Sequence, residues 1–596
     1  MTLSTLDYAI IIFVFLLVLG VGVWVSRRSG KDSTEFFLSG RNMPWWLLGF
    51  SMVATTFSTD TPNLVTDIVR VNGVAGNWAW WAFLLTGLLT VFVYARLWRK
   101  SNVATDMEFY ELRYGGKAAD FLRWFRALYL GVAFNLLAMA GVTLAAIKIG
   151  QIMLGLPPLT TVAIAGSITV IFSMLGGFRG VVYTDFFLFL IAMVGAFGAA
   201  IYLIDIPEVG GLDTLLSHPN VSDKLALLPD FSQMDALIAI LIIPLAVQWW
   251  SAWYPGAEPG GGGYIAQRML AAKDEKNAVG ATFFFNVMHI AVRPWPWILV
   301  ALASLIIYPD LASIQEAFPN VTPDKLGHDL AYPAMLTMLP SGLLGLVLAS
   351  LGAAYMSTLS THLNWGSSYV VNDFYKQKVN PNASEKELVR VGRISTLLLM
   401  VFSAFIALNM QNAKELFDLI LMFGAGTGLI FILRWFWWRI NAWSEISAMF
   451  ASGIISLLIK KTSLGVVLFG GAEAAGLFPA WAELPLAVLI TSLIWISVTF
   501  LTPAEKTEVL QSFNDKIQAG GPGWKKFQNS NSETQAWVVP RGLLAVLLGS
   551  ILVYSTLFAV GNWLYGDYAW AGGLTGLVLV SGFLLNKQWG KLKEVF

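Results

Sequence analysis

Long apolar runs separated by short polar connections make up most of the chain. Each run is close to or above the roughly 20 residues that a helix needs to cross a bilayer, and no alternating strand pattern competes with them. The fifteen predicted spans are 7–27, 46–70, 76–98, 124–152, 157–175, 181–204, 235–268, 279–308, 335–372, 390–409, 413–437, 442–460, 479–502, 542–563 and 567–586. Several exceed the length of a perpendicular helix, which predicts tilted or broken helices. The pattern therefore predicts an all-α integral membrane protein.

Basic residues in the connections predict the topology. When the N-terminus is placed outside, the cytoplasmic connections hold 30 of the 38 Lys and Arg residues and the opposite side holds six. Cytoplasmic loops are enriched in these residues, so we expect a multi-pass protein of the cell membrane with its N-terminus outside and its C-terminus in the cytoplasm. The loops 205–234 and 309–334 then face outward. The cytoplasmic linker 503–541, which contains Gly-Gly-Pro-Gly, is predicted to be partly disordered.

Two spans carry residues that interrupt a helix. From Met52 to Asn63 the first holds five Ser or Thr hydroxyls, Asp60 and Pro62, and proline has no backbone N–H and pushes the preceding residue out of the helical region. The second, residues 248–264, has two prolines and four consecutive glycines. Freed carbonyls are tolerated at membrane depth only where protein buries them or where they line a wet cavity. In transporters, broken helices at that depth bind ions and substrates.

The two breaks lie five spans apart and are entered from opposite sides of the membrane, which is typical of an inverted-topology repeat. The alternative is that they reflect only the ordinary abundance of glycine and proline in membrane helices. The repeat would divide the chain into an N-terminal helix and loop (1–45), a first repeat (46–204), an extracellular loop (205–234), a second repeat (235–440) and accessory helices (441–596).

A stripe of small and hydroxyl-bearing residues follows one face of the span between residues 351 and 363. Such a stripe permits close packing of helices. It also offers neutral oxygens of the kind that a hard monovalent cation binds, and the spacing leaves both interpretations open. The stripe consists of Ala354, Ser357, Thr358 and Thr361, with Ser360 alongside.

Composition narrows the functional classes. Hydrophobic residues make up 56% of the 596 and charged residues 13%, with a mean hydropathy of +0.65, whereas soluble proteins have about 25% charged residues. The net charge of +1 argues against a nucleic-acid partner. With no cysteine and four scattered histidines, thiolate chemistry is excluded and a histidine metal cluster is not expected. The sequence contains no nucleophile–base pair that would indicate an enzyme and no filter motif that would indicate a channel.

Three motifs resemble those of a known family. They are Phe36-Phe-Leu-Ser-Gly-Arg41 before the first break, Tyr264-Ile-Ala-Gln-Arg268 followed by Ala271-Ala-Lys273 after the second, and Met356-Ser-Thr-Leu-Ser360 in the stripe. In order and spacing they resemble the sodium:solute symporter family, over roughly residues 5 to 440. The resemblance implies a LeuT-type five-plus-five inverted repeat with extra N- and C-terminal helices. It also implies alternating access, with sodium, a small solute and the bilayer as partners; a monomer would suffice, although the sequence does not fix the oligomeric state.

The resemblance further implies two cation sites. The principal sodium site would take the backbone oxygens of Ala54, Phe57 and Ala354 and the hydroxyls of Ser357 and Thr358. A second sodium, which some members bind, would lie between Asp185 and the hydroxyls of Ser357, Ser360 and Thr361. The alternative for Asp185 is a proton-bearing or hydrogen-bonded residue near the cytoplasmic mouth.

The substrate is expected beside the first break. A sugar is the preferred substrate, because the carboxylate of Asp60 can accept several hydroxyl hydrogen bonds at once. The alternative substrate is an amino acid or a carboxylate, whose carboxylate group would bind Arg293. A further alternative for the function is a sensor built on the same scaffold. Arg293 and Glu258 could instead form a salt bridge with each other. The candidate substrate residues are Thr56, Ser58, Asp60, Thr61, Asn77, Tyr254, Glu258 and Arg293.

Overall fold

The computed structural model describes residues 3–29, 37–251, 258–319, 321, 326–410, 413–470, 476–527, 537 and 539–593. Within these ranges the chain is helical, and the one β-pairing is an isolated bridge between Met43 and Ala272. Ten helices of this part are long and apolar enough to cross a membrane, and five shorter apolar helices accompany them. All of them overlap predicted spans. The all-α membrane fold is confirmed, and the exact number of crossings stays a prediction.

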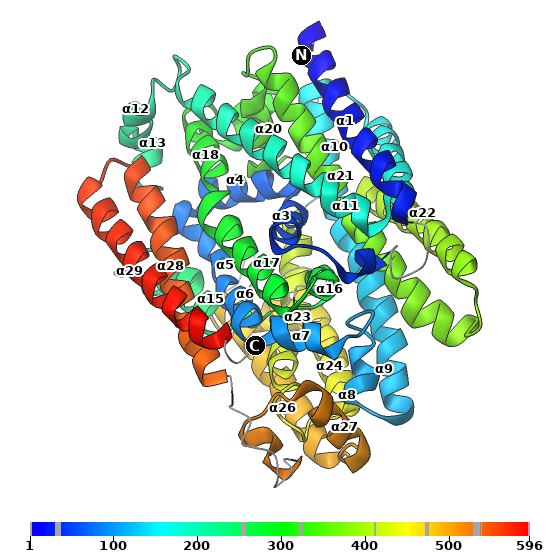
Figure 1. Cartoon of the computed structure of the whole chain (residues 1–596). Coiled ribbons are helices and arrows are strands. Elements are labelled where there is room, and N and C mark those ends of the chain that lie inside the picture. Colours follow the sequence, from blue (N-terminus) through cyan, green and yellow to red (C-terminus); the bar gives the residue numbers. More distant parts are fainter. Residues whose placement is uncertain are drawn as a thin grey trace.

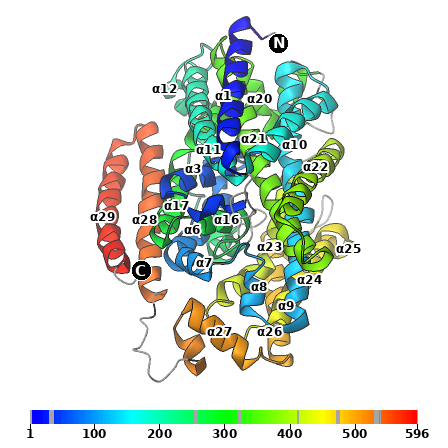
Figure 2. The ribbon, with the colours of Figure 1, turned by 45° about the vertical axis from the view of Figure 1, so that its right-hand side comes forward.

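The elements up to residue 250 are α1 (Thr5–Ser29), α3 (Trp45–Thr55), α4 (Asp60–Asn72), α5 (Trp78–Trp81), α6 (Leu84–Leu89), α7 (Ala95–Ser101), α8 (Phe109–Arg113), α9 (Gly116–Leu128), α10 (Asn135–Leu154), α11 (Pro158–Ile204), α12 (Leu212–Ser217), α13 (Pro219–Ser222), α14 (Met234–Leu237) and α15 (Ile243–Ala246). Those after it are α16 (Gly263–Ala271), α17 (Glu275–Val287), α18 (Trp295–Ile307), α19 (Leu311–Ala317), α20 (Ala331–Leu336), α21 (Leu343–Tyr369), α22 (Glu385–Asn409), α23 (Ala413–Leu433), α24 (Ala442–Lys461), α25 (Ser463–Phe469), α26 (Glu483–Leu501), α27 (Thr507–Ile517), α28 (Val539–Leu564) and α29 (Tyr568–Lys593). Helices α3, α16 and α17 lie in the middle of the molecule, and the α28–α29 pair lies on one flank (Figures 1 and 2).

The first predicted break is present. Helix α3 ends at Thr55, residues 56–59 are not helical, and α4 begins at Asp60. Pro62 then stands in the first turn of α4, where its missing N–H costs nothing because first-turn N–H groups have no partner within the helix. The proline therefore starts the second half-helix rather than only ending the first.

The second predicted break is also present. A short turn ends at Trp250, Ser251 is not helical, and α16 begins at Gly263. Gly260 and Gly261 have φ angles of 85° and 82°, a left-handed conformation that other residues rarely adopt. The glycine run thus turns the chain into α16, and residues 252–257 between the two halves lie outside the described part.

Two predicted spans belong to a single helical element, α11, which must bend. Ile164 lines the same cavity as Leu348, and Gly195 packs against Val347 and Ser350. A straight helix would hold residues 164 and 195 about 46 Å apart at 1.5 Å per residue, yet both lie beside the same turn of α21. Because α11 folds back on itself in this way, it supplies two limbs, as the two predicted spans require.

Residues 503–527 of the linker are folded, and the expectation that the linker 503–541 is partly disordered stays a prediction. Helix α27 buries Leu510 and Phe513, and the following turn buries Trp524. Trp524 stacks on Phe513 with ring centroids 5.4 Å apart and donates a hydrogen bond from Nε1 to the carbonyl of Trp435 (2.8 Å). The apolar residues of α27 recur at helical spacing, and this amphipathic signal outweighs the Gly-Gly-Pro-Gly turn that follows it.

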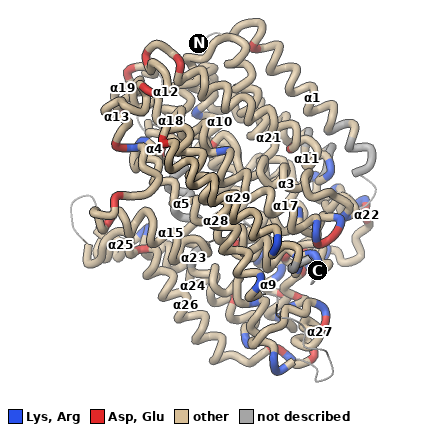
Figure 3. Tube along the Cα trace, turned by 60° about the vertical axis from the view of Figure 1, so that its left-hand side comes forward, with Lys and Arg blue, Asp and Glu red and all other residues tan. Residues whose placement is uncertain are grey.

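The distribution of charge matches a membrane protein. Charged residues gather toward the two ends of the molecule, with Lys and Arg dense around α9, α22 and α27, while α28 and α29 are almost free of them along most of their length (Figure 3). This agrees with the asymmetry used for the topology. Which end faces the cytoplasm stays a prediction.

The extra N-terminal helix is fastened to α21. Asp7 accepts hydrogen bonds at Oδ1 from the backbone N–H groups of Gly342 (2.7 Å) and Gly345 (2.9 Å). These N–H groups belong to the start of α21 and would otherwise lack a partner. A carboxylate at that position also interacts favourably with the helix dipole, so α1 caps the helix that carries the hydroxyl stripe.

Candidate functional site

The end of α3 meets the middle of α21 at the first break. Thr358 donates from its hydroxyl to the carbonyl oxygens of Phe57 (2.9 Å) and Thr55 (3.2 Å). Phe57 lies between the two half-helices, where carbonyls are released from the regular helical pattern. The structure therefore brings together the break and the stripe, two features that stand about 300 residues apart in the sequence.

The five positions predicted for the principal sodium site line this junction. Each residue is at most 4% exposed. The possible ligand groups are backbone carbonyls and hydroxyls, which are neutral oxygens of the kind that a hard cation binds. The donor set fits sodium, and the coordination itself stays a prediction. The five residues are Ala54, Phe57, Ala354, Ser357 and Thr358.

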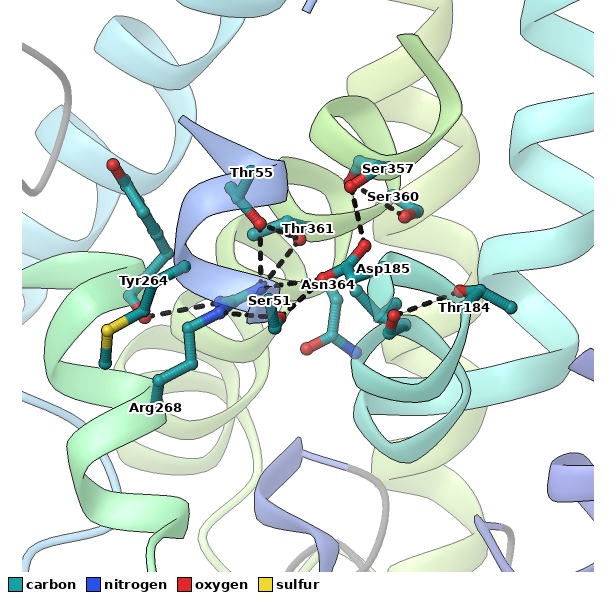
Figure 4. A network of polar contacts seen from close by, with 12 residues as sticks. Ser51, Thr55, Thr184, Asp185, Tyr264, Arg268, Ser357, Ser360, Thr361 and Asn364 are labelled. Carbon is teal, nitrogen blue, oxygen red and sulfur yellow. Dashed lines mark hydrogen bonds and ion pairs between the residues drawn. The ribbon is translucent and has the colours of Figure 1, made fainter. Parts of the chain in front are cut away.

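Asp185 lies next to this junction, on α11, and is fully buried. Its carboxylate accepts hydrogen bonds from the hydroxyls of Ser51 (2.5 Å) and Ser357 (2.6 Å), as Figure 4 shows. Ser357 belongs to both predicted cation sites and physically joins them. Ser360 instead donates to the carbonyl of Ser357 (3.0 Å). Asp185 is thus hydrogen-bonded to both α3 and α21, and its role in a second cation site stays a prediction.

Arg268, on α16, reaches into the same cluster. Its Nε donates to Ser51 Oγ (3.0 Å), and one terminal nitrogen donates to Thr55 Oγ1 (3.0 Å) and Thr361 Oγ1 (2.9 Å). The same nitrogen lies 3.6 Å from Asp185 Oδ2. Sequence reasoning quoted Arg268 only as part of a motif and gave it no role. The sequence did contain a signal for such a role. Arg268 follows soon after a helix that glycines interrupt, and a charge buried at membrane depth needs a partner.

The predicted substrate residues of the break surround a half-buried carboxylate. Asp60 begins α4, and Thr61 Oγ1 lies 3.5 Å from its Oδ1. The hydroxyl of Ser58 is buried without a hydrogen-bond partner among the described residues. Asp60 makes no ion pair within that part of the chain. A carboxylate and a hydroxyl at a broken helix are therefore available to a ligand.

Arg293 is committed to the protein backbone. Its terminal nitrogens donate to the carbonyls of Val53 (3.3 Å) and Thr56 (3.1 Å) and to the hydroxyl of Thr56 (3.2 Å). These are carbonyls at the C-terminal end of α3, where a cation is favoured by the helix dipole. Arg293 thus caps the first half-helix, and the Thr56 hydroxyl is occupied by this contact and by the carbonyls of its own helix.

The suggested salt bridge between Glu258 and Arg293 is wrong. Glu258 pairs with Arg126 of α9, and Arg434 at the end of α23 lies 3.9 Å from its other oxygen. Arg434 also pairs with Glu445 of α24 (3.4 Å). Burial of a carboxylate demands a nearby cation, and two arginines distant in sequence provide it. Glu258 therefore anchors the second break to α9 and to the end of α23.

Two further predicted substrate residues take no part in the contacts described above. Asn77 donates to the carbonyl of Val74 (2.9 Å) and accepts from Trp80 Nε1 (2.8 Å), so its bonds stay within its own turn. Tyr254 lies outside the described residues. A substrate role for either stays a prediction.

Comparison with known proteins decides the family. The model of the sodium:solute symporter family matches residues 36–452, which is most of the chain. The chain belongs to the sodium:solute symporter family. This membership makes sodium the coupling ion and makes the chain a transporter rather than an enzyme.

Curated relatives of this symporter include sugar and polyol carriers. It is 27% identical over 487 residues to a sodium/glucose cotransporter of Vibrio parahaemolyticus, covering 78% of this chain and 87% of the relative. It is 28% identical over 491 residues to the human sodium/myo-inositol cotransporter 2, covering 76% and 70%. Among solved structures, a substrate-bound, outward-open sodium-coupled sialic acid symporter matches with a TM-score of 0.63 and 20% identity, covering 84% and 99%. That likeness confirms the LeuT-type fold.

Proposed function

We propose that this symporter imports a small polyhydroxylated solute, a sugar or a polyol, together with sodium. The observation that carries the proposal is the carboxylate of Asp60, which stands half-buried at the break, close to the hydroxyl of Ser58, for which the described residues provide no hydrogen-bond partner. A carboxylate accepts hydrogen bonds from adjacent hydroxyls, as a sugar or polyol offers. The relatives named for glucose and myo-inositol support the same class.

The engagement of Arg293 argues against an amino acid as substrate. That alternative needs a cation for the carboxylate of the substrate, and the two terminal nitrogens of Arg293 already bond to the end of α3. Diverting them would leave the carbonyl of Thr56 without this partner in a buried position, which costs about 1–3 kcal/mol, and the carbonyl of Val53 would keep only the hydroxyl of Thr56. A neutral solute requires no such loss.

In the proposed cycle, sodium binds from outside between α3 and α21 at the five oxygens described above. Thr358 then exchanges its hydrogen bonds to Phe57 and Thr55 for contact with the ion. Coupling requires that sodium prefers one conformation, because an ion that binds both states equally shifts nothing. The separation of α21 from α3 would dismantle the site and release both ligands inside.

A thermal-shift screen of the purified protein tests the substrate class. Glucose, galactose, myo-inositol and proline are each titrated in sodium chloride and in potassium chloride, because a ligand that binds the folded state raises its melting temperature. We expect stabilisation by a sugar or polyol in sodium only. Stabilisation by proline, with none by the hydroxylated solutes, would contradict the proposal.

The role of Asp60 is tested with the ligand that the screen identifies. Asp60→Asn removes the charge and keeps the shape, and a hydrogen bond to a charged group is worth about 1.5–3 kcal/mol. We therefore expect the apparent Kd to rise roughly 10- to 150-fold. Asp223→Asn, the same change at an exposed loop position, should leave it unaltered. Equal affinity in wild type and Asp60→Asn would refute the assignment.

A further inference from the structure

The cluster around Asp185 contains a cation that belongs to the protein. The guanidinium of Arg268 is fully buried and contacts oxygens from three other helices. Figure 4 shows it approaching Ser51 and Thr55 of α3, Thr361 of α21 and the carboxylate of Asp185. Two of these, Asp185 and Thr361, are positions that the family resemblance assigned to a second sodium.

Charge balance opposes a sodium ion beside this guanidinium. Asp185 supplies one negative charge and Arg268 one positive charge, and their other hydrogen-bond partners among the described residues are neutral hydroxyls and the carbonyl of Tyr264. A second cation would leave a net positive charge in a buried site, where an uncompensated charge costs several kcal/mol. The hydroxyls of Thr55 and Thr361 also already accept hydrogen bonds from Arg268.

We propose that Arg268 is the built-in cation of the second position, so that this symporter binds a single sodium ion, at the junction of α3 and α21. The inference rests on sodium coupling and not on the identity of the solute. A sodium ion can leave its site, whereas the guanidinium is tethered to α16. Any movement of α21 away from α3 must therefore break the contacts of Arg268 with Thr55 or Thr361, so the residue links α16 to α3, α11 and α21.

The oxygens that Arg268 occupies would form a cation site without it. Arg268→Ala would leave the Asp185 carboxylate and the hydroxyls of Ser51, Ser357 and Thr361 facing vacated space. One full negative charge with neutral oxygens is a donor set that a hard monovalent cation accepts. Removal of the arginine should therefore create a second sodium site rather than only weaken the fold.

Equilibrium binding of ²²Na⁺ to the purified full-length protein tests this inference without any organic solute. We expect one bound sodium per chain in wild type and two in Arg268→Ala. Arg268→Lys retains a tethered cation and should bind one. Arg390→Ala removes an exposed arginine on α22 and should also bind one.

Two results of these counts would overturn the inference directly, and a third variant supplies a further test. The first is two sodium ions per wild-type chain. The second is a count of one in a folded Arg268→Ala protein, which would show that the vacated oxygens attract no ion. If Arg268→Ala does not fold, Asp185→Asn replaces it, and we expect its count to equal that of wild type because Asp185 serves the arginine. Loss of one sodium in Asp185→Asn would refute the inference, whereas failure of sugar uptake would leave these counts unaffected.

Discussion

Truncation of Thr358 to alanine should weaken sodium binding far more than folding. The hydroxyl of Thr358 donates to the carbonyls of Phe57 and Thr55 across the α3–α21 junction. Its loss removes one neutral hydrogen bond from the folded state, worth about 0.5–1.5 kcal/mol. For the ion it removes one contact to a full charge, for which about 1.5–3 kcal/mol is typical. The half-saturating sodium concentration should therefore rise roughly 10- to 150-fold.

The assay is the melting temperature of each purified variant as sodium chloride replaces potassium chloride at constant ionic strength. Thr358→Ser keeps the oxygen and should stay near the wild-type midpoint. Thr396→Ala removes a buried hydroxyl that bonds to Gly392 on α22, and so controls for the loss of any buried hydroxyl. A wild-type sodium midpoint in Thr358→Ala would show that this residue is no ion ligand and that the site lies elsewhere.

Three further predictions follow from the fold. Asp7→Ala removes the cap that α1 supplies to α21 and should lower the free energy of unfolding by about 1–2 kcal/mol. Asp7→Asn keeps a hydrogen-bond acceptor and should lower it less. An equal loss of unfolding free energy in the two variants would exclude capping by Asp7. Trp524→Ala should lower the free energy of unfolding, measured by thermal unfolding, by about 3–5 kcal/mol, because the ring is fully buried. The control Trp570→Ala, at an exposed tryptophan, should change it little. A negligible change in Trp524→Ala would mean that the linker is not packed against the rest of the protein. An impermeant thiol reagent applied outside should label Ser222→Cys and spare Lys591→Cys in this cysteine-free chain, and the reverse labelling would overturn the topology.

Local sequence chemistry predicted the parts of the site that depend on neighbouring residues. The break before α4 follows from Pro62 and the hydroxyls around it, and the alignment of Ser357, Thr358 and Thr361 follows from helical periodicity. Both could be read from short windows. Their meeting could not, because a contact between residues 57 and 358 depends on how distant helices pack; the family resemblance supplied that expectation, and the structure confirms it.

The partners of buried charges were beyond local reasoning. Glu258 is paired with Arg126 and Arg434, which lie more than 100 residues away on either side. Arg293 binds the end of α3 instead of an acidic residue. The need for a partner is evident from each charge alone, whereas its identity is set by tertiary packing.

The amphipathic face of α27 was, by contrast, present in the sequence. Its apolar residues Leu510, Phe513 and Ile517 recur at helical spacing within a polar stretch. The Gly-Gly-Pro-Gly that follows is typical of a turn, and the prediction for the linker used that turn rather than the helical spacing. In a membrane protein a short amphipathic helix of this kind is easily passed over, because its mean hydropathy is far below that of the spans.

The central claim is sodium-driven transport through the α3–α21 junction, and uptake into proteoliposomes tests it most directly. The purified protein is reconstituted, loaded with potassium inside, and given a radiolabelled solute that the thermal-shift screen has identified, with sodium or potassium outside. The account predicts accumulation above the external concentration only with an inward sodium gradient, collapse of that accumulation when a sodium ionophore is added, and its loss at the same sodium concentration in Thr358→Ala. Equal uptake in sodium and potassium, or an undiminished sodium-driven accumulation in Thr358→Ala, would contradict it.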